Sequence, residues 1–426
     1  MITKVTGIEL IDSRGVPAVC ARVDFENGIY AYASVPSGAS VGSHEAKELR
    51  DNDARFGGKG VSQAVKNINT EIANALSGKS FADQEELDST LKKLDGTDDK
   101  SNLGANAILA VSIAYARASA KYKGLPLYRT LCDKPEPLLP CPMMNILNGG
   151  AHASNNLDIQ EFMVMPFGAD SFRQAMDMGL ETYIALKSLL KGKGYSTLVG
   201  DEGGFAPDVE NDETAIELII KAAEHAGLKP GRDIGIALDC AATEWVESDG
   251  YYKQPKSGLI LNSGDLLKHY EELVVNYPIV SIEDGMGEDD IQSHSLMTKS
   301  LVLQTVGDDL FVTNPERIRM GVLNHAANAV LIKPNQIGTV SETLNAMKTA
   351  EDMGLSCIVS HRSGDTEDTF IADLAAATCC GQIKTGAPAR AERTAKYNRL
   401  LLIEQELGEY AKFAGGSTIK NLLAEQ

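Results

Sequence analysis

Residues 329–338 read Ala-Val-Leu-Ile-Lys-Pro-Asn-Gln-Ile-Gly, an apolar run that ends at Lys333. Three earlier apolar runs end in the same way, each at a carboxylate: Asp239, Glu283 and Asp308. The intervals between these run ends suit a strand followed by a returning helix, which takes about 30 residues. In a βα barrel all such strand ends share one face, and catalysis takes place on that face. The runs therefore predict an α/β barrel with three acids and one lysine at its catalytic end.

Three carboxylates that converge on one face repel each other unless a divalent cation binds them. Oxygen ligands without histidine or cysteine favour Mg²⁺ over zinc. A lysine beside such a cation would have its ammonium form disfavoured, which makes Lys333 a candidate general base. The alternative for a single acid is capping of the next helix, and for a single rim lysine it is solvent exposure. Three acids in register favour the metal site.

The composition of the chain limits the classes of protein to which it can belong. The chain has 426 residues, enough for two or more domains. Its formal net charge of −19 argues against nucleic acid as the main ligand, because phosphate binding requires a basic surface. We expect no signal peptide, because Lys4, Glu9, Asp12 and Arg14 interrupt the first apolar residues. We also expect no transmembrane segment, since no apolar stretch reaches roughly 18 residues. The 7 cysteines form no CxxC pair, which favours reduced thiols and a cytoplasmic location.

The N-terminal region predicts a three-stranded antiparallel meander over 4–11, 18–25 and 29–35. Asn-Gly at 27–28, between the last two apolar runs, is a strong hairpin signal. Further on, Ser62 is the predicted N-cap of a helix that ends at Gly78, and a second, alanine-rich helix is predicted over 106–121.

Four prolines between 135 and 142 interrupt any helix and predict a domain boundary after residue 133. We therefore expect an N-terminal α+β domain over 1–133 and a catalytic barrel over 134–426. Within the barrel, Asp212 is the predicted cap of a helix that ends at Gly227.

Short segments spread over nearly the whole chain add a specific pattern. In order they are Ser-Gly-Ala-Ser (37–40), Asn-Gly-Gly (148–150) with His152, Gln-Glu-Phe-Met (160–163), Gly-Asp-Glu-Gly-Gly (200–204), Ala-Leu-Asp-Cys (237–240), Ser-Ile-Glu-Asp (281–284), Gly-Asp-Asp-Leu (307–310), Asn-Gln-Ile-Gly (335–338) and Ser-His-Arg-Ser-Gly (360–364). At this spacing the set resembles the enolase family.

The resemblance implies a modified (β/α)8 barrel that begins ββαα and continues with six βα units, preceded by an α+β domain. It implies reversible dehydration of 2-phospho-D-glycerate to phosphoenolpyruvate in glycolysis and gluconeogenesis. The reaction would use two Mg²⁺ ions per site, the second bound only with substrate. It also implies a homodimer or homo-octamer in the cytoplasm, with a secondary cell-surface or secreted pool and further protein partners as alternatives.

The resemblance also implies a role for each site residue. The residues matched to catalysis are Lys333 as base, Glu202 as acid, Glu161 as its assistant, and His361. Substrate binding is implied for His152, Gln160, Arg362, Ser363, Lys384 and Ser40. Metal binding is implied for Asp239, Glu283, Asp308 and Ser40, the last in a lid loop over 37–43. Among so many carboxylates we expect the pKa of Glu202 to be raised, as suits an acid near neutral pH.

Some positions depart from the family pattern without removing a group that does chemistry: Val16, Val41, Gly285-Met286-Gly287, Ile291 and Pro334. Two alternatives stay open. One is a related dehydratase or racemase that acts on a sugar acid, against which the phosphate clamp and the Ser40 loop argue. The other is a non-catalytic scaffold for partner proteins, which the intact set of ionisable groups disfavours.

Overall fold

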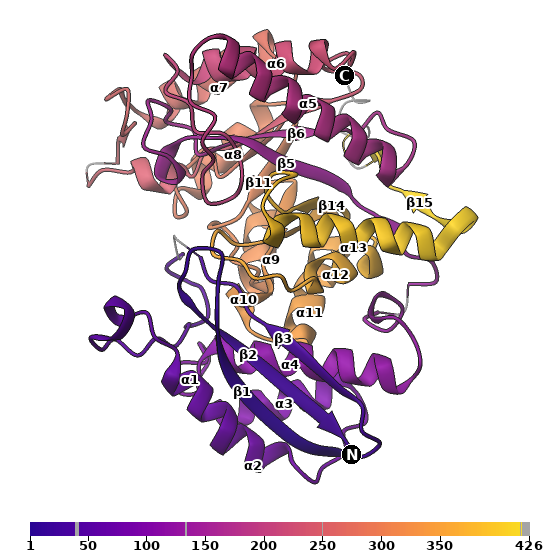
Figure 1. The fold of residues 1–426 in the computed structure, drawn as a ribbon. Helices are drawn as coiled ribbons and strands as arrows, with labels where there is room; N and C mark the ends of the chain where they lie inside the picture. Colours follow the sequence, from indigo (N-terminus) through magenta and orange to yellow (C-terminus); the bar gives the residue numbers. More distant parts are fainter. Residues whose placement is uncertain (39–41, 133, 249, 418, 420–426) are drawn as a thin grey trace.

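The computed structural model describes residues 1–38, 42–132, 134–248, 250–417 and 419. An N-terminal α+β part and a larger barrel follow each other along the chain (Figure 1). The predicted boundary after residue 133 stays a prediction, and Asp133 itself lies outside the described residues.

The N-terminal part is an antiparallel sheet covered by helices. The strands β1 (Ile2–Ile11), β2 (Pro17–Phe25) and β3 (Tyr30–Ser34) pair in sequence order, which confirms the predicted meander. One face of β2 is buried through Val19, Ala21 and Val23, as period-two alternation requires. The helices are α1 (Ser62–Asn67), a π-helical segment (Ile68–Ile72), α2 (Ala73–Leu76), α3 (Gln84–Asp95) and α4 (Ala105–Tyr122).

Two predicted helix caps are wrong by one residue. Ser62 is the first residue of α1 and not its N-cap. Its N–H donates at 2.9 Å to the carboxylate of Asp51, which lies 11 residues earlier in the sequence. Asn211, not Asp212, caps α6, since its side chain accepts from Thr214 N at 2.9 Å. Asn and Asp cap equally well, so neighbouring residues of this kind leave the helix start ambiguous by one position.

The larger part is a closed eight-stranded barrel that begins ββαα, which confirms the implied modification. Strand β6 runs antiparallel to both neighbours, β5 and β7, while the other barrel neighbours are parallel. In order the elements are β5 (Cys141–Asn148), β6 (Glu161–Met165), α5 (Phe172–Gly192), α6 (Asp212–His225), β7 (Gly235–Asp239), α7 (Ser263–Asn276), β10 (Ile279–Glu283), α8 (Ile291–Ser300), β11 (Gln304–Gly307), α9 (Pro315–Leu323), β12 (Ala329–Ile332), α10 (Pro334–Ile337), α11 (Val340–Asp352), β13 (Ser356–Ser360), α12 (Phe370–Thr378), β14 (Gly381–Lys384) and α13 (Ala391–Leu407).

Short pairs lie outside the barrel wall. Strand β4 (Leu138–Leu139) pairs with β15 (Lys412–Phe413), and β8 (Tyr252–Lys253) pairs with β9 (Ile260–Leu261). No helix in the described part of the chain is long and apolar enough to cross a membrane.

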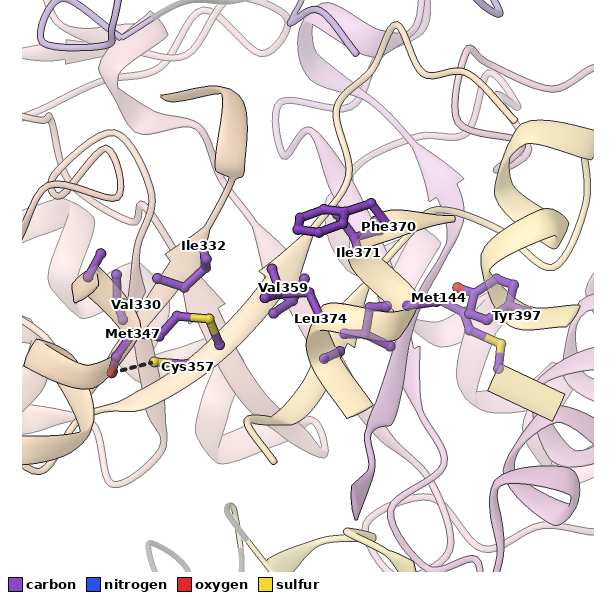
Figure 2. Packing of buried hydrophobic residues seen from close by; sticks show 14 of the residues in the cluster. Met144, Val330, Ile332, Met347, Cys357, Val359, Phe370, Ile371, Leu374 and Tyr397 are labelled. Carbon is purple, nitrogen blue, oxygen red and sulfur yellow. Dashed lines mark hydrogen bonds between the residues drawn. The ribbon is translucent and has the colours of Figure 1, made fainter. Parts of the chain in front are cut away.

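Alternate residues of the barrel strands belong to two different hydrophobic clusters. In β12, Ala329 and Leu331 belong to the cluster inside the barrel, while Val330 and Ile332 belong to the layer between strands and helices. Figure 2 shows this outer layer, where strand residues meet side chains of α11, α12 and α13: Val330, Ile332, Val359, Met347, Phe370, Leu374 and Tyr397. Because both faces of each strand are buried, the strands read as continuous apolar runs.

Strand polarity brings the site together. The antiparallel β6 starts where its neighbours end, so its first residue, Glu161, pairs in register with Asp239, the last residue of β7. Asp239 pairs in turn with Glu283, the last residue of β10. Carboxylates that are far apart in sequence therefore meet at one end of the barrel.

Candidate active site

One pocket at this end of the barrel contains nearly all the predicted site residues. Glu283 is not among its lining residues but binds one of them, Lys384, and Ser40 lies outside the described residues. The predicted residues that line the pocket are His152, Gln160, Glu161, Glu202, Asp239, Asp308, Lys333, His361, Arg362, Ser363 and Lys384. The structure therefore brings together the residues that the apolar runs and the family resemblance pointed to, and their roles stay predictions.

The strand ends hold the charged groups as predicted. Asp239, Glu283 and Lys384 are the last residues of β7, β10 and β14, while Asp308 and Lys333 directly follow β11 and β12. Lys333 has the extended backbone (φ −120°, ψ 104°) that the following proline favours.

Lys384 neutralises several acids at once. Its Nζ atom lies 2.7 Å from Asp239 Oδ2, 2.9 Å from both carboxylate oxygens of Glu283, and 3.4 Å from Glu161 Oε2. Burial lowers the pKa of Lys384, but Asp239 and Glu161 raise it by more, so the net pKa is well above its usual value. Lys384 is therefore an ammonium ion embedded among the acids.

Lys333 pairs with the third predicted metal ligand, Asp308, through Nζ and Oδ2. Burial lowers the pKa of Lys333, but the charge of Asp308 raises it by more because Asp308 stabilises the ammonium form directly, so the net pKa is above its usual value. The expected loss of the ammonium form beside a cation stays a prediction. Gln336 supports the pair, since its Nε2 donates to Asp308 Oδ1 at 3.0 Å.

The donor set fits a hard divalent cation. Asp239, Glu283 and Asp308 supply buried carboxylate oxygens, which Mg²⁺ prefers. Burial, and then the charge of Asp239, raises the pKa of Glu283 to about 8, which is the expected result of crowding acids away from water. Each of the three is bound by an ammonium group, so these acids need positive charge to be buried here.

The described residues also form two compact groups of possible metal ligands, one of which includes Asp284 and Asp309 beside the predicted ligand Asp308. The ligand atoms of Asp284, Asp308 and Asp309 lie within 4.8 Å of one another, as do those of His152, Glu161 and Glu202. Among the described residues, the predicted triad does not form such a compact group. Two of its members, Asp239 and Glu283, bind Lys384, whereas Asp308 binds Lys333. The periodicity of the apolar runs does not indicate this division.

The carboxyl groups of Glu161 and Glu202 lie close together, with oxygen atoms within 4.8 Å of each other. Burial, and then the charge of Glu202, raises the pKa of Glu161 well above its usual value. Burial also acts to raise the pKa of Glu202, but His361 and His152 lower it by more, so its net pKa is well below its usual value. The expectation of a raised pKa at Glu202 is therefore wrong, because the neighbouring basic groups outweigh burial. The pKa values of the two carboxyls are therefore shifted in opposite directions, so Glu161 favours its protonated form more than Glu202 does.

A strained loop presents Glu202. Gly203, next to it, has φ +88°, and a Cβ atom there would lie 2.9 Å from the carbonyl oxygen of Ala389. Glycine is thus required both for the backbone angle and for the close approach. Asn145 holds the side chain, since its Nδ2 donates to Glu202 Oε2 at 3.0 Å.

Arg362 is bound by a residue from the N-terminal part. Its two terminal nitrogens donate to the two carboxylate oxygens of Glu45, at 2.9 and 3.1 Å, and one also donates to Asn335 Oδ1 at 3.1 Å. The planar fork of arginine matches a carboxylate or a phosphate in this bidentate way. Glu45 thus occupies part of the predicted anion clamp, and the sequence analysis missed it.

The lid base is joined to the barrel by backbone bonds. Ser37 and Gly364 exchange N–H···O bonds of 2.8 and 2.9 Å. Arg14 donates to the carbonyl oxygens of Ser37 and Gly38 at 3.2 and 3.3 Å. Residues 39–41 of the predicted lid, which include Val41, lie outside the described residues. Arg14 belongs to the Asp-Ser-Arg-Gly segment at 12–15. This motif is the sequence feature that could have indicated a contact with the lid.

Comparison with known proteins agrees with this geometry. Residues 2–131 match the family model described as enolase, N-terminal domain, and residues 136–422 match the model described as enolase, C-terminal TIM barrel domain. The chain belongs to the enolase family. It is 51% identical over 424 residues to the enolase of Natranaerobius thermophilus, a match that covers 99% of each chain. The enolase family implies Mg²⁺ as cofactor, in agreement with the acidic groups at the barrel end.

Proposed function

We propose that this chain is an enolase that interconverts 2-phospho-D-glycerate and phosphoenolpyruvate with loss or gain of water. The observation that carries the proposal is the meeting of Lys333, the neighbouring carboxyls of Glu161 and Glu202, and the acids Asp239 and Asp308 in one pocket. This set can remove a proton from one carbon and protonate a leaving hydroxyl on the next.

Lys333 is the proposed base. It takes the proton from the carbon next to the substrate carboxylate and becomes an ammonium ion, leaving an enediolate. For this step Lys333 must first be neutral, which its pairing with Asp308 opposes. A divalent cation held by Asp239, Glu283 and Asp308 would withdraw Asp308 from Lys333 and stabilise the negative charge of the enediolate.

Glu202 is the proposed acid, and Glu161 is the source of its proton. The leaving hydroxyl accepts this proton and departs as water, while the electrons of the enediolate form the carbon–carbon double bond. The raised pKa of Glu161 and the lowered pKa of Glu202 support a shared proton, since one group stores it at neutral pH.

Arg362, Ser363, His152, Gln160 and Ser40 are the proposed substrate ligands, with Lys384 beside the substrate carboxylate. The bidentate binding of Glu45 by Arg362 supports an anion clamp, because a phosphate group presents oxygens in a similar geometry. Two Mg²⁺ ions per site, the second with Ser40 as ligand, belong to the same proposal. So do a cytoplasmic location and a homodimer or homo-octamer.

The experiment is to follow phosphoenolpyruvate formation from 2-phosphoglycerate by ultraviolet absorbance, first with Mg²⁺ and then with excess chelator. Turnover that needs the metal and is lost in Lys333→Ala supports the proposal. A folded, Mg²⁺-bound wild-type protein without turnover would contradict it, and assays with sugar acids would then test the related dehydratases and racemases. A scaffold role predicts partner binding that survives Lys333→Ala.

A further inference from the structure

Arg393 lies behind the catalytic pocket, and its side chain is 0% exposed. It projects from the first turn of α13 into the space between three loops. One terminal nitrogen, Nη1, donates to the ring atom Nδ1 of His361 at 2.6 Å and to the carbonyl oxygen of Arg362 at 2.6 Å. The other, Nη2, donates to the carbonyl oxygens of Ser363 at 2.5 Å and Asp201 at 3.1 Å.

The bond to His361 determines which ring nitrogen carries hydrogen. A guanidinium group has only N–H donors and stays protonated in proteins, so Nδ1 of His361 must be the acceptor. In a neutral imidazole the remaining hydrogen then sits on Nε2. A doubly protonated ring would point an N–H group at Arg393 Nη1, which leaves no acceptor between them. His361 is thus held neutral and in the Nε2–H form.

The Nε2–H group faces the proposed acid. Nε2 of His361 lies 3.5 Å from Oε2 of Glu202, the oxygen that also accepts from Asn145 Nδ2 at 3.0 Å. The opposite tautomer would place a lone pair against this carboxylate oxygen. Arg393 also binds the carbonyl of Asp201, the residue before Glu202, so it contacts His361 directly and the backbone next to Glu202.

Neighbouring residues leave space for the guanidinium group of Arg393 and balance its charge. A Cβ atom on Gly386 would lie 2.8 Å from Cδ of Arg393, so the absence of a side chain at Gly386 lets Arg393 reach the pocket. Asp365 provides a counter-charge, with Oδ2 at 3.7 Å from Nη1. A buried charge is costly, and it is retained here with four hydrogen-bond acceptors around it.

We propose that Arg393 is a positioning residue that locks His361 in the Nε2–H tautomer and thereby orients Glu202 for proton transfer. The consequence for catalysis rests on the proposed function, whereas the tautomer itself does not. Arg393 touches no reacting atom itself but also binds the backbone carbonyls of Arg362 and Ser363, so its replacement should lower kcat by more than it raises KM.

The test reads the tautomer directly in the full chain labelled with ¹⁵N in the histidine rings. Long-range ¹H–¹⁵N spectra distinguish the two neutral tautomers, and the His361 signals are assigned from their loss in His361→Gln. We expect the Nε2–H pattern in the wild type at neutral pH. An Nδ1–H pattern, or an average of the two, would overturn the proposal without any need for a variant.

The variant is Arg393→Met, which keeps the stem and removes every donor. We expect its His361 to average between tautomers, with kcat lowered by about 10²-fold, the scale of a proton-transfer contribution. A folded Arg393→Met protein that retains the pure Nε2–H pattern would overturn the proposal.

Lys396→Met is the matched control. Lys396 lies one turn further along α13, has a side chain 1% exposed, and donates to the carbonyls of Thr366 and Glu392 without touching His361. We expect it to leave the tautomer unchanged, and averaging in this control would overturn the specific role of Arg393. If the wild type has the Nε2–H tautomer but no turnover, the proposed function fails and the assignment of Arg393 stands.

Discussion

The Nζ atom of Lys384 lies 2.7 Å from Oδ2 of Asp239, so an ammonium group occupies the middle of the acidic cluster at the barrel end. The same nitrogen binds both oxygens of Glu283. A lysine in this position supplies the positive charge without which two buried carboxylates would repel each other. The acids can therefore be buried before any cation binds.

Removing this charge should destabilise the protein. We predict that Lys384→Met lowers the free energy of unfolding by about 3–5 kcal/mol without divalent cations, the usual cost of leaving a buried charge unpaired. Mg²⁺ should recover a large part of this loss, because a cation can replace the missing ammonium group. Urea unfolding with and without Mg²⁺ measures both effects. Lys348→Met, an exposed lysine on α11, is the control and should show little change. Equal loss with and without Mg²⁺ would contradict the explanation.

Isotope exchange distinguishes the role of the proposed base from the role of the proposed acid. We predict that Lys333→Ala loses exchange of the substrate's α-proton with solvent by at least about 10²-fold, while Glu202→Gln keeps the exchange and loses dehydration. The reason is that exchange requires only proton removal and return at carbon. Proton NMR of 2-phosphoglycerate in D₂O, with Mg²⁺, measures exchange directly. Full exchange in Lys333→Ala would assign the base to another residue.

The anion clamp should depend on the planar fork of Arg362. We predict that Arg362→Lys raises KM for 2-phosphoglycerate by about 10–100-fold, since lysine cannot form two parallel bonds to one anion. Steady-state kinetics at fixed Mg²⁺ gives KM and kcat separately. Arg319→Lys, a surface change on α9, should leave both unchanged. An unchanged KM in Arg362→Lys would remove Arg362 from the proposed clamp.

Asp212 should make stability depend on pH. Its carboxylate is buried beneath the loop of site residues 152–160 and accepts from the N–H of Asp158 at 3.1 Å. Burial, and then the charge of Asp158, raises the pKa of Asp212 from 3.8 to about 8. Between about pH 4 and 8, Asp212 is therefore protonated in the folded state and ionised in the unfolded state. Its contribution to the free energy of unfolding decreases as pH rises through this range.

We predict that Asp212→Asn removes a slope of about 1.4 kcal/mol per pH unit between pH 5 and 7. Urea unfolding across this range measures it. Glu217→Gln, an exposed change on the same helix, should keep the wild-type slope. An Asp212→Asn protein with the wild-type slope would show that Asp212 is ionised in the folded state.

Local patterns in the chain predicted most of the fold and the strand-end residues Asp239, Glu283, Asp308 and Lys333, while the other site residues were implied by the family resemblance. The apolar run before Lys333 has the length and burial of a barrel strand, and Asn27-Gly28 permits the hairpin between β2 and β3. These features depend on neighbouring residues, because strand and turn preferences act over a few positions. The reversed direction of β6 came from family resemblance, since periodicity does not report which way a strand runs.

The chemical state of the site depends on contacts across the chain. Arg362 meets Glu45 from the N-terminal part, and Arg393 meets His361 across two loops. The pKa values of Glu161 and Glu202 are shifted in opposite directions because burial and basic neighbours act differently on the two carboxyls. The spacing of the apolar runs indicates Asp239, Glu283, Asp308 and Lys333 at the end of the barrel, and the family resemblance implies the other groups. Their partners and protonation states follow only from three-dimensional packing, because electrostatic interactions depend on distance and on exclusion of water.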